Sequence, residues 1–242
     1  MPDMDPKPLR TGMSLIETLI GLSLFLIITT TALEGYAALR DHFNRARDEA
    51  EIREGIYAAL TTMRIDLNES GRGLARAVSL GLIEGFRPGE AGFHVFSLDT
   101  RLEAVSDLTA GQTSLALRSA AEVRRGRRIC LIQGSRGETA EIASVTGNRI
   151  LLCAPLENGY DRDSMRILLL REVACFFDQK NTLRRRVNTS SAQPLMEDAA
   201  GLRVENTDSG PLVRVSLRHS LEKEHSHELA VVLKNLALAG TR

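Results

Sequence analysis

The sequence contains no tryptophan, and aromatic residues make up only 4% of its 242 residues. Proteins that bind single-stranded nucleic acid without sequence preference stack the bases on aromatic side chains, so this composition argues against such a platform. The chain also lacks a net charge, because 31 lysines and arginines balance 31 aspartates and glutamates. A neutral chain has no overall field that attracts a polyanion. We therefore expect no nucleic-acid partner.

Signatures of catalysis are missing as well. The sequence has no Walker-type phosphate loop, no dinucleotide-binding fingerprint and no Gly-x-Ser-x-Gly elbow. The Gly71-Arg72-Gly73 segment is too short to cradle a phosphate and is simpler to explain as a helix stop. These absences predict that the chain is not an enzyme and binds no cofactor.

Three histidines near the end of the chain form the only candidate metal site. His225 and His227 occupy alternate positions, so they could share one face of a strand and bind a metal with His219 across a hairpin. The segment between them, residues 221–224, is polar and charged. A polar hairpin tip explains the pattern more simply, and we expect no metal site.

Cysteine is scarce, with Cys130, Cys153 and Cys175 as its three copies. Their spacing matches no zinc pattern. In an oxidising compartment one disulfide could form and leave one free thiol, and three buried apolar cysteines are an equal alternative. If a disulfide forms, we expect it between Cys130 and Cys153, on the first and third strands of a predicted meander. Cys175 would then be buried and free.

A long uncharged run is the most prominent feature that the chain does contain. No charged residue lies between Glu17 and Glu34. Residues 13–33 are about as long as the roughly 20 residues that a membrane-spanning helix needs. Glu17 is the exception, because an unpaired carboxylate in a membrane helix costs about 2.5–3.5 kcal/mol. The run predicts a transmembrane segment in which Glu17 has a partner or a function.

The segment Gly12-Met13-Ser14-Leu15-Ile16-Glu17 and the run after it resemble the class III signal of type IV pilins and type II secretion pseudopilins. In that family a prepilin peptidase cuts after the glycine and methylates the new N-terminus. The resemblance implies a leader peptide at residues 1–12, a cut between Gly12 and Met13, and N-methylation of Met13. The family usually has phenylalanine after the cut, where this chain has Met13.

Glu17 gains a physical role from this processing. The new α-amino group is largely protonated at neutral pH, and Glu17 lies about one helical turn from it. When helices bundle, Glu17 of one subunit can pair with the amine of a neighbour and set their axial register. An ordinary signal peptide cut near Thr30-Thr31-Ala32, or an uncut signal anchor, would not need a carboxylate there.

After the uncharged run the sequence remains helical in character. Apolar residues recur at steps of three and four, which predicts an amphipathic helix. They are Ile52, Ile56, Leu60, Met63 and Leu67. We assign the charged residues between them, Asp66 included, to a solvated face. Gly71 and Gly73 end this helix, which we predict over residues 13–74. Where major pilins usually carry a helix-softening proline, this chain has Glu34-Gly35.

From Gly92 onward, short apolar runs alternate with turn residues, which predicts a mostly antiparallel β domain within residues 75–242. The expected strands are Phe93–Leu98, Thr113–Arg118, Arg128–Gln133, Glu138–Val145, Arg149–Cys153, Met165–Phe177, Thr182–Val187, Leu202–Asn206, Leu212–His219 and Glu228–Leu236. Arg128–Cys153 forms a meander within an insert at about residues 113–160. Pro194–Gly201 is the only internal hinge that we expect. The fold class is therefore α+β, with one long N-terminal helix packed on a β domain.

Basic residues cluster at Arg184-Arg185-Arg186 on one of these strands. Such a cluster could meet an acidic partner or DNA. A single short run in a neutral chain is simpler to explain as a solvated strand.

The helix end at Arg64–Gly71 and several segments of the β domain resemble minor pilins of the PilW type. The β-domain segments are the meander, Phe177–Val187 and Gln193–Ala199. This resemblance implies a structural subunit that is anchored in the inner membrane by its helix, with a periplasmic β domain, and is then built into a type IV pilus at its tip or initiation complex. Its partners would be other minor pilins, the major pilin, the prepilin peptidase and the inner-membrane assembly platform.

Two alternatives remain open. A minor pseudopilin of a type II secretion system would carry the same signal. A membrane-anchored extracytoplasmic enzyme or metal-binding module would share the anchor but would not need Glu17.

Overall fold

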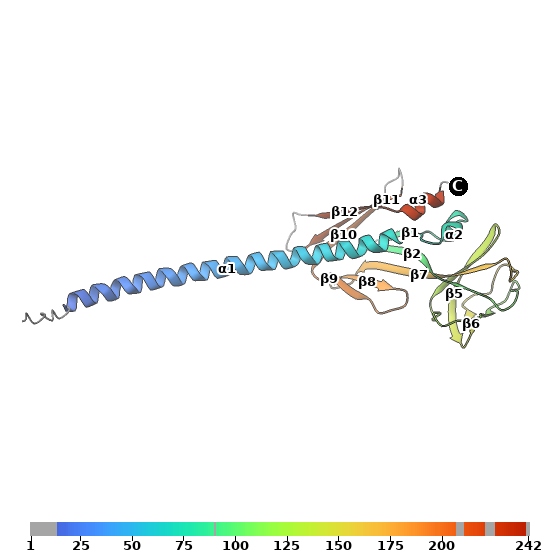
Figure 1. Ribbon diagram of the computed structural model, residues 1–242, viewed down its shortest axis with the longest axis horizontal. Helices are drawn as coiled ribbons and strands as arrows, with labels where there is room; N and C mark the ends of the chain where they lie inside the picture. Colours follow the sequence, from blue (N-terminus) through green and yellow to red (C-terminus); the bar gives the residue numbers. More distant parts are fainter. Residues whose placement is uncertain (1–13, 90, 207–210, 221–225, 241–242) are drawn as a thin grey trace, which may run out of the picture. The chain divides into compact units, whose positions relative to one another are not determined.

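The computed structural model describes residues 14–89, 91–206, 211–220 and 226–240. One long helix and a set of antiparallel strands dominate it, so the chain is α+β, as its sequence predicts (Figure 1). The chain divides into two compact units, Met1–Ile52 and Arg53–Arg242. Helix α1 (Leu15–Asn68) belongs to both units.

The first unit is the part of α1 up to Ile52. Every described residue from Ser14 to Glu51 is exposed. Five hydroxyl side chains in the apolar part donate hydrogen bonds to the carbonyl oxygen four residues earlier, namely those of Thr18, Ser23, Thr29, Thr30 and Thr31. Because these bonds satisfy the hydroxyls within the helix, serine and threonine are tolerated in an apolar environment. The helix runs unbroken through Gly35.

In the second unit, one face of α1 is buried. The buried residues are Ile56, Ala59, Leu60, Met63, Asp66 and Leu67. Their three- and four-residue spacing confirms the predicted amphipathic helix. The helix ends at Asn68, earlier than predicted, because the chain then turns through Gly71 and Gly73, which have φ angles of +71° and +73°. A short helix, α2 (Ala75–Ser79), follows.

The larger of two sheets contains nine strands, all paired antiparallel. They are β1 (Phe86–Gly89), β2 (Gly92–Leu102), β3 (Ser114–Ala116), β4 (Arg128–Gln133), β5 (Arg136–Thr146), β6 (Arg149–Leu152), β7 (Arg166–Phe177), β8 (Leu183–Val187) and β9 (Gln193–Met196). The main path runs β1-β2-β7-β4-β5-β6-β3, with β8 and β9 joined to β7. Strands β4, β5 and β6 form the predicted meander.

Two apolar clusters lie along this sheet. In β4, Ile129 and Leu131 belong to a cluster that includes residues of β3 and β6, whereas Cys130 and Ile132 belong to a cluster that includes Leu74 and Ala77. Because side chains alternate between the faces of a strand, the two clusters lie on opposite faces. Strand β7 contributes residues to both clusters and so connects them.

The smaller sheet has three strands, β10 (Ala199–Asn206), β11 (Leu212–His219) and β12 (His227–Val232), in that order. Helix α3 (Lys234–Gly240) follows β12, so the expected strand over Glu228–Leu236 was too long. The expected hinge at Pro194–Gly201 covers most of β9, residues 197 and 198, and the start of β10, and so connects the two sheets. Within the described residues β9 pairs only with β8, and such an edge strand tolerates Pro194.

Candidate functional site

Glu17 lies in the first turn of α1. Its Oε2 accepts a hydrogen bond of 3.0 Å from the backbone N–H of Ser14. The first N–H groups of a helix have no partner within it, and a carboxylate there also interacts favourably with the helix dipole. Within this chain Glu17 therefore caps the start of α1. Gly12 and Met13, the predicted cleavage site, lie outside the described residues.

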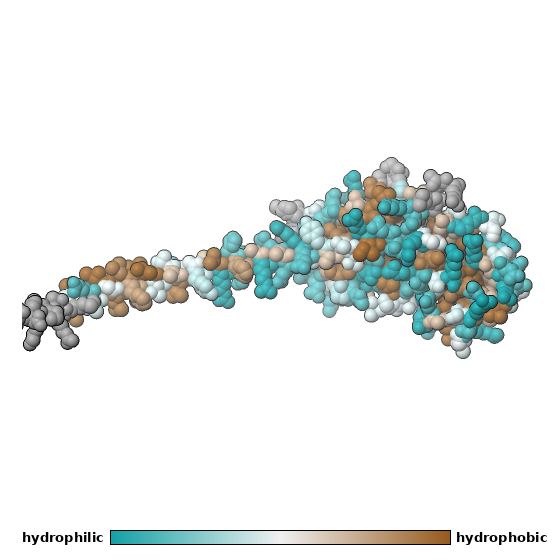
Figure 2. Space-filling view, viewed as in Figure 1, coloured by the Kyte–Doolittle hydropathy of each residue, from teal (hydrophilic) through white to brown (hydrophobic). Residues whose placement is uncertain are grey.

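The part of α1 that follows Glu17 is long and apolar enough to cross a membrane, judged by length and composition. None of its most apolar 18-residue window is buried, and large side chains such as Leu19, Phe25 and Ile28 are more than half exposed. Figure 2 shows these apolar residues gathered along the first part of the helix and polar residues after them. These properties fit a single-pass membrane anchor.

A buried ion pair joins the other end of α1 to the large sheet. Asp66 is 1% exposed, and its two carboxylate oxygens accept hydrogen bonds of 2.6 and 2.7 Å from Nε and Nη2 of Arg185 in β8. This two-point geometry is the strongest that arginine makes with a carboxylate. It also raises the pKa of Arg185 above its usual value. The predicted solvated face is therefore wrong for Asp66.

The two neighbours of Arg185 point to different partners. Arg184 donates to Asp178 at 2.5 Å, and this hydrogen bond, together with backbone N–H groups of residues 180 and 182, lowers the pKa of Asp178 to about 2. Arg186 lies 5.7 Å above the ring of Phe176. The three arginines do lie on a strand, as predicted. The prediction that all three are solvated was wrong, because only Arg186 is exposed.

The cysteines do not form the expected link. Cys130, Cys153 and Cys175 are all free, and Cys153 is exposed whereas the other two are buried. Cys130 points into the cluster that includes Leu74, while Cys153 follows β6, whose Leu152 belongs to the opposite cluster. Strand β5 lies between β4 and β6, and two strand spacings of about 4.8 Å each put these cysteines beyond the reach of a disulfide.

The histidines of the weighed metal site are only partly described. His225 lies outside the described residues. The register between β11 and β12 pairs Leu217 with His227, which places His227 on the same face as His219. The ring of His227 lies edge-on to Tyr57 of α1, with a centroid distance of 6.0 Å. Among the described residues, no group of three or more His, Cys, Asp or Glu side chains could hold a metal.

One edge of β7 changes partner part of the way along the strand. Residues 166–169 pair with β4, and residues 173–177 pair with β8. Between them, Nη2 of Arg127 donates to the carbonyl of Leu170 at 2.7 Å. The side-chain oxygen of Asn188 accepts from the N–H of Glu172 at 2.9 Å, and the N–H of Asn188 donates to the carbonyl of Glu172 at 2.7 Å. These two residues bridge the gap between the ladders.

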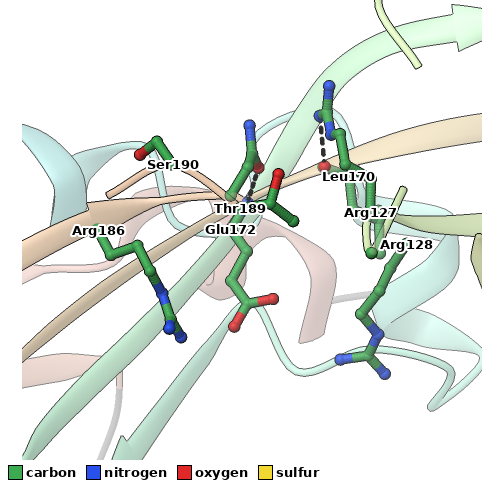
Figure 3. A pocket seen from close by; sticks show the side chains of 9 residues that line it. Arg127, Arg128, Leu170, Glu172, Arg186, Thr189 and Ser190 are labelled. Atoms are coloured by element: carbon green, nitrogen blue, oxygen red, sulfur yellow. Dashed lines mark hydrogen bonds between the residues drawn. The ribbon is translucent and has the colours of Figure 1, made fainter. Parts of the chain in front are cut away.

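A cavity of about 360 Å³ lies at this change of partner, and we call it the edge-gap pocket (Figure 3). It is lined by Gly126, Arg127, Arg128, Leu170, Glu172, Arg186, Asn188, Thr189 and Ser190. Three arginines thus surround one carboxylate. The guanidinium groups of Arg128 and Arg186 appear on either side of the Glu172 carboxylate in Figure 3.

Sequence reasoning did not identify either the Asp66–Arg185 pair or the edge-gap pocket. Asp66 falls beside Leu67 and one turn after Met63, so its position within the apolar stripe was an available signal. The pocket had no such signal, because it depends on which strands share the edge of β7.

Comparisons with known proteins leave the family of this chain open. No family model matches it, and no curated protein matches it. Solved structures that share some similarity include the tailspike protein gp49 from Pseudomonas phage LKA1, with 24% identity over 31% of this chain and a TM-score of 0.28. The Gp54 tailspike of Acinetobacter baumannii bacteriophage AP22, solved in complex with A. baumannii capsular saccharide, has 22% identity over 32% of the chain and a TM-score of 0.27. This chain spans only 15% of the length of either tailspike, and likenesses this slight support no conclusion about fold or function.

Proposed function

We propose that this chain is a minor pilin of the PilW type, a structural subunit of a type IV pilus. In this proposal a prepilin peptidase cuts between Gly12 and Met13 and methylates Met13. Helix α1 then holds the subunit in the inner membrane with its β domain in the periplasm. The subunit joins other minor pilins and the major pilin in the complex at the filament tip, through the inner-membrane assembly platform.

The observation that supports this proposal most is the contrast within α1. A single helix of 54 residues has an exposed first part, uncharged over residues 18–33, and a last part with one buried face. An exposed apolar helix is stable only where another apolar medium replaces water, and at roughly 25 cal/mol per Å² the cost of leaving it in water is large. A bilayer provides that medium before assembly, and the helices of neighbouring subunits provide it afterwards.

Glu17 is the residue through which the proposal can be tested. In the membrane subunit it lies at the end of the apolar run, where water can reach it. In a filament it would leave that water, so it must find a cation on a neighbour or remain as a costly buried charge. The amine of a neighbouring Met13 would supply that cation.

The first test measures assembly. We expect Glu17→Ala and Glu17→Gln to be cleaved and inserted like the wild type but to co-purify poorly with partner minor pilins. Glu34→Gln is the matched control, because it removes one charge from the same helix just beyond the apolar run. If both Glu17 variants assemble like the wild type and like the control, Glu17 is not an assembly contact.

The second test measures processing. We expect the intact mass of membrane-extracted protein to match a chain that begins at Met13 with one added methyl group. A mature chain that begins near Leu33 would instead show an ordinary signal peptide and contradict the pilin proposal.

A further inference from the structure

The edge-gap pocket has more positive than negative charge that is free to meet a ligand. The charge of Arg127 is already paired within the protein, because its Nη2 contacts Asp99 at 2.5 Å and also donates to the carbonyl of Leu170. Glu172 is the one acidic group of the lining, and its Oε1 lies 2.9 Å from Nδ1 of His94. Arg128 and Arg186 remain, and neither has a carboxylate partner within the described part of the chain.

These two guanidinium groups are held in place by aromatic rings. Arg128 lies 5.8 Å from the ring centre of Phe96, and Arg186 lies 5.7 Å from that of Phe176. An arginine over a ring face makes a cation–π contact and uses none of its hydrogen-bond donors there, so its N–H groups stay available for a ligand. Both side chains therefore lose less freedom on binding than solvated arginines do.

The walls of the pocket are fixed by the backbone. Asn188 bridges the gap in the ladder with a φ angle of +52°, and it leads into Thr189 and Ser190. Arg127 fixes the opposite side and is buried, with its Nε lacking a hydrogen-bond acceptor among the described residues. The volume of about 360 Å³ lies within the roughly 300–1,000 Å³ typical of small-ligand sites.

We propose that the edge-gap pocket binds a carboxylate group through Arg128 and Arg186, whose two positive charges exceed the single negative charge of Glu172. Guanidinium groups bind carboxylates by two parallel hydrogen bonds, which gives both affinity and orientation. The carboxylate can belong to a free small acid or to an acidic side chain of another protein. This site lies on the β domain, and the proposal stands independently of pilus assembly.

The test uses the full-length protein in detergent and two probes. Glutarate represents a free acid, and the peptide acetyl-Ala-Glu-Ala-amide presents a glutamate side chain as its only carboxylate. We expect glutarate to raise the Tm and to protect Arg128 and Arg186 from phenylglyoxal, as measured by peptide mass spectrometry. Protection by the peptide as well assigns the site to a protein-borne carboxylate, and protection by glutarate alone assigns it to a free acid.

Two double variants provide the comparison. Arg128→Gln with Arg186→Gln should weaken glutarate binding by about tenfold or more, because hydrogen bonds to charged groups contribute about that much. Arg136→Gln with Arg149→Gln removes the same charge from exposed positions on β5 and β6 and should bind like the wild type. The single variant Arg186→Gln, at an exposed position, serves if the first double variant does not fold.

Three results would overturn the proposal. One is an equal rise in Tm with sodium chloride at the same ionic strength, since that would be screening rather than binding. Another is unchanged glutarate binding in the Arg128 and Arg186 variant. The last is phenylglyoxal labelling of Arg128 and Arg186 that is the same with and without glutarate.

Discussion

Leu26 and Met63 are apolar residues of the same continuous helix, yet the side chain of Leu26 is 63% exposed and that of Met63 is fully buried. Around Leu26 the helix carries apolar side chains on all its faces, as a helix does when an apolar medium surrounds it. Around Met63 apolar residues occupy one face, which is the composition of a helix that packs on a single core. The pattern of apolar residues, rather than their number, tells the two environments apart.

The charged residues of α1 show the same division. Arg47 and Glu51 form an ion pair at 2.9 Å in which both side chains are more than 60% exposed. Asp66 forms its pair with Arg185 at 2.6 Å while it is 1% exposed. Water screens the first pair, and the protein surrounds the second, so the two should differ strongly in their effect on stability.

The largest expected effect comes from breaking the buried pair. Asp66→Ala leaves Arg185 without its partner and should lower the free energy of unfolding by about 3–5 kcal/mol, toward the lower end because Arg185 keeps some contact with water. Thermal or denaturant unfolding in detergent measures this. Glu51→Ala is the control and should leave the unfolding midpoint unchanged. A similar, small effect of both variants would show that burial does not separate the two pairs.

Replacing both partners sharpens this result. Asp66→Leu with Arg185→Met removes both charges and keeps apolar volume, so it should recover most of the stability that Asp66→Ala loses. If the double variant is as unstable as Asp66→Ala, the pair contributes a specific geometry that apolar packing cannot replace.

The next effect compares the two apolar residues. Met63→Ala should cost about 2–3 kcal/mol of unfolding free energy, because it opens a cavity in the core that the neighbouring side chains fill only in part. Leu26→Ala should leave the unfolding of the β domain unchanged, because Leu26 has no core to leave. Denaturant unfolding, followed by a signal from the β domain, distinguishes them. An equal loss would mean that the two parts of α1 share one core.

A chemical probe reports on the buried end of the helix. Burial raises the pKa of Cys130 and Cys175 to about 12, whereas Cys153 is exposed. In the folded protein at pH 8, we expect a thiol reagent to modify Cys153 and to spare the other two. Asp66→Ala should increase the labelling of Cys175, whose surroundings include Asp66 and Arg185. Fast labelling of Cys175 in the wild type would contradict the packing described here.

The smallest effect concerns acid. The hydrogen bond from Arg184 lowers the pKa of Asp178 to about 2 from an ordinary value of 3.8. This group therefore favours the folded state above pH 4, and its contribution is lost as the pH falls toward 2. Asp178→Asn should flatten the decline of Tm over that range by a small amount, because Asp178 is partly solvated. An unchanged slope would show that the pair contributes nothing measurable.

The sequence predicted much of the fold, because hydrophobic periodicity carries the information. Strands β4 and β11 have the predicted bounds, and the meander pairs as expected. Elements β1, β9, α2 and α3 were not predicted. They are short, with seven residues in α3 and five or fewer in each of the others. Segments of this length are too short for an apolar pattern to repeat.

The contacts between distant segments could not be predicted in the same way. Asp66 and Arg185 are 119 residues apart, so the position of Asp66 in the apolar stripe indicates burial but not which cation it meets. Cys130 and Cys153 illustrate the opposite error, because the meander was expected to curl and bring them together, whereas β5 holds their two strands apart. Pairing of this kind depends on sheet register, and register shifts at bulges such as the one between Leu98 and Thr100.

The long separation between Asp66 and Arg185 has a consequence for the time course of folding. During synthesis from the N-terminus, α1 is complete long before β8 has been made. The apolar face of α1 around Met63 therefore stays uncovered while more than a hundred further residues are added. Contacts this distant in sequence form late and slowly. During that time the face is exposed apolar surface, which chaperones bind and through which incomplete chains aggregate. We expect the appearance of β8, rather than the folding of the meander, to be the step that commits the chain to its native state.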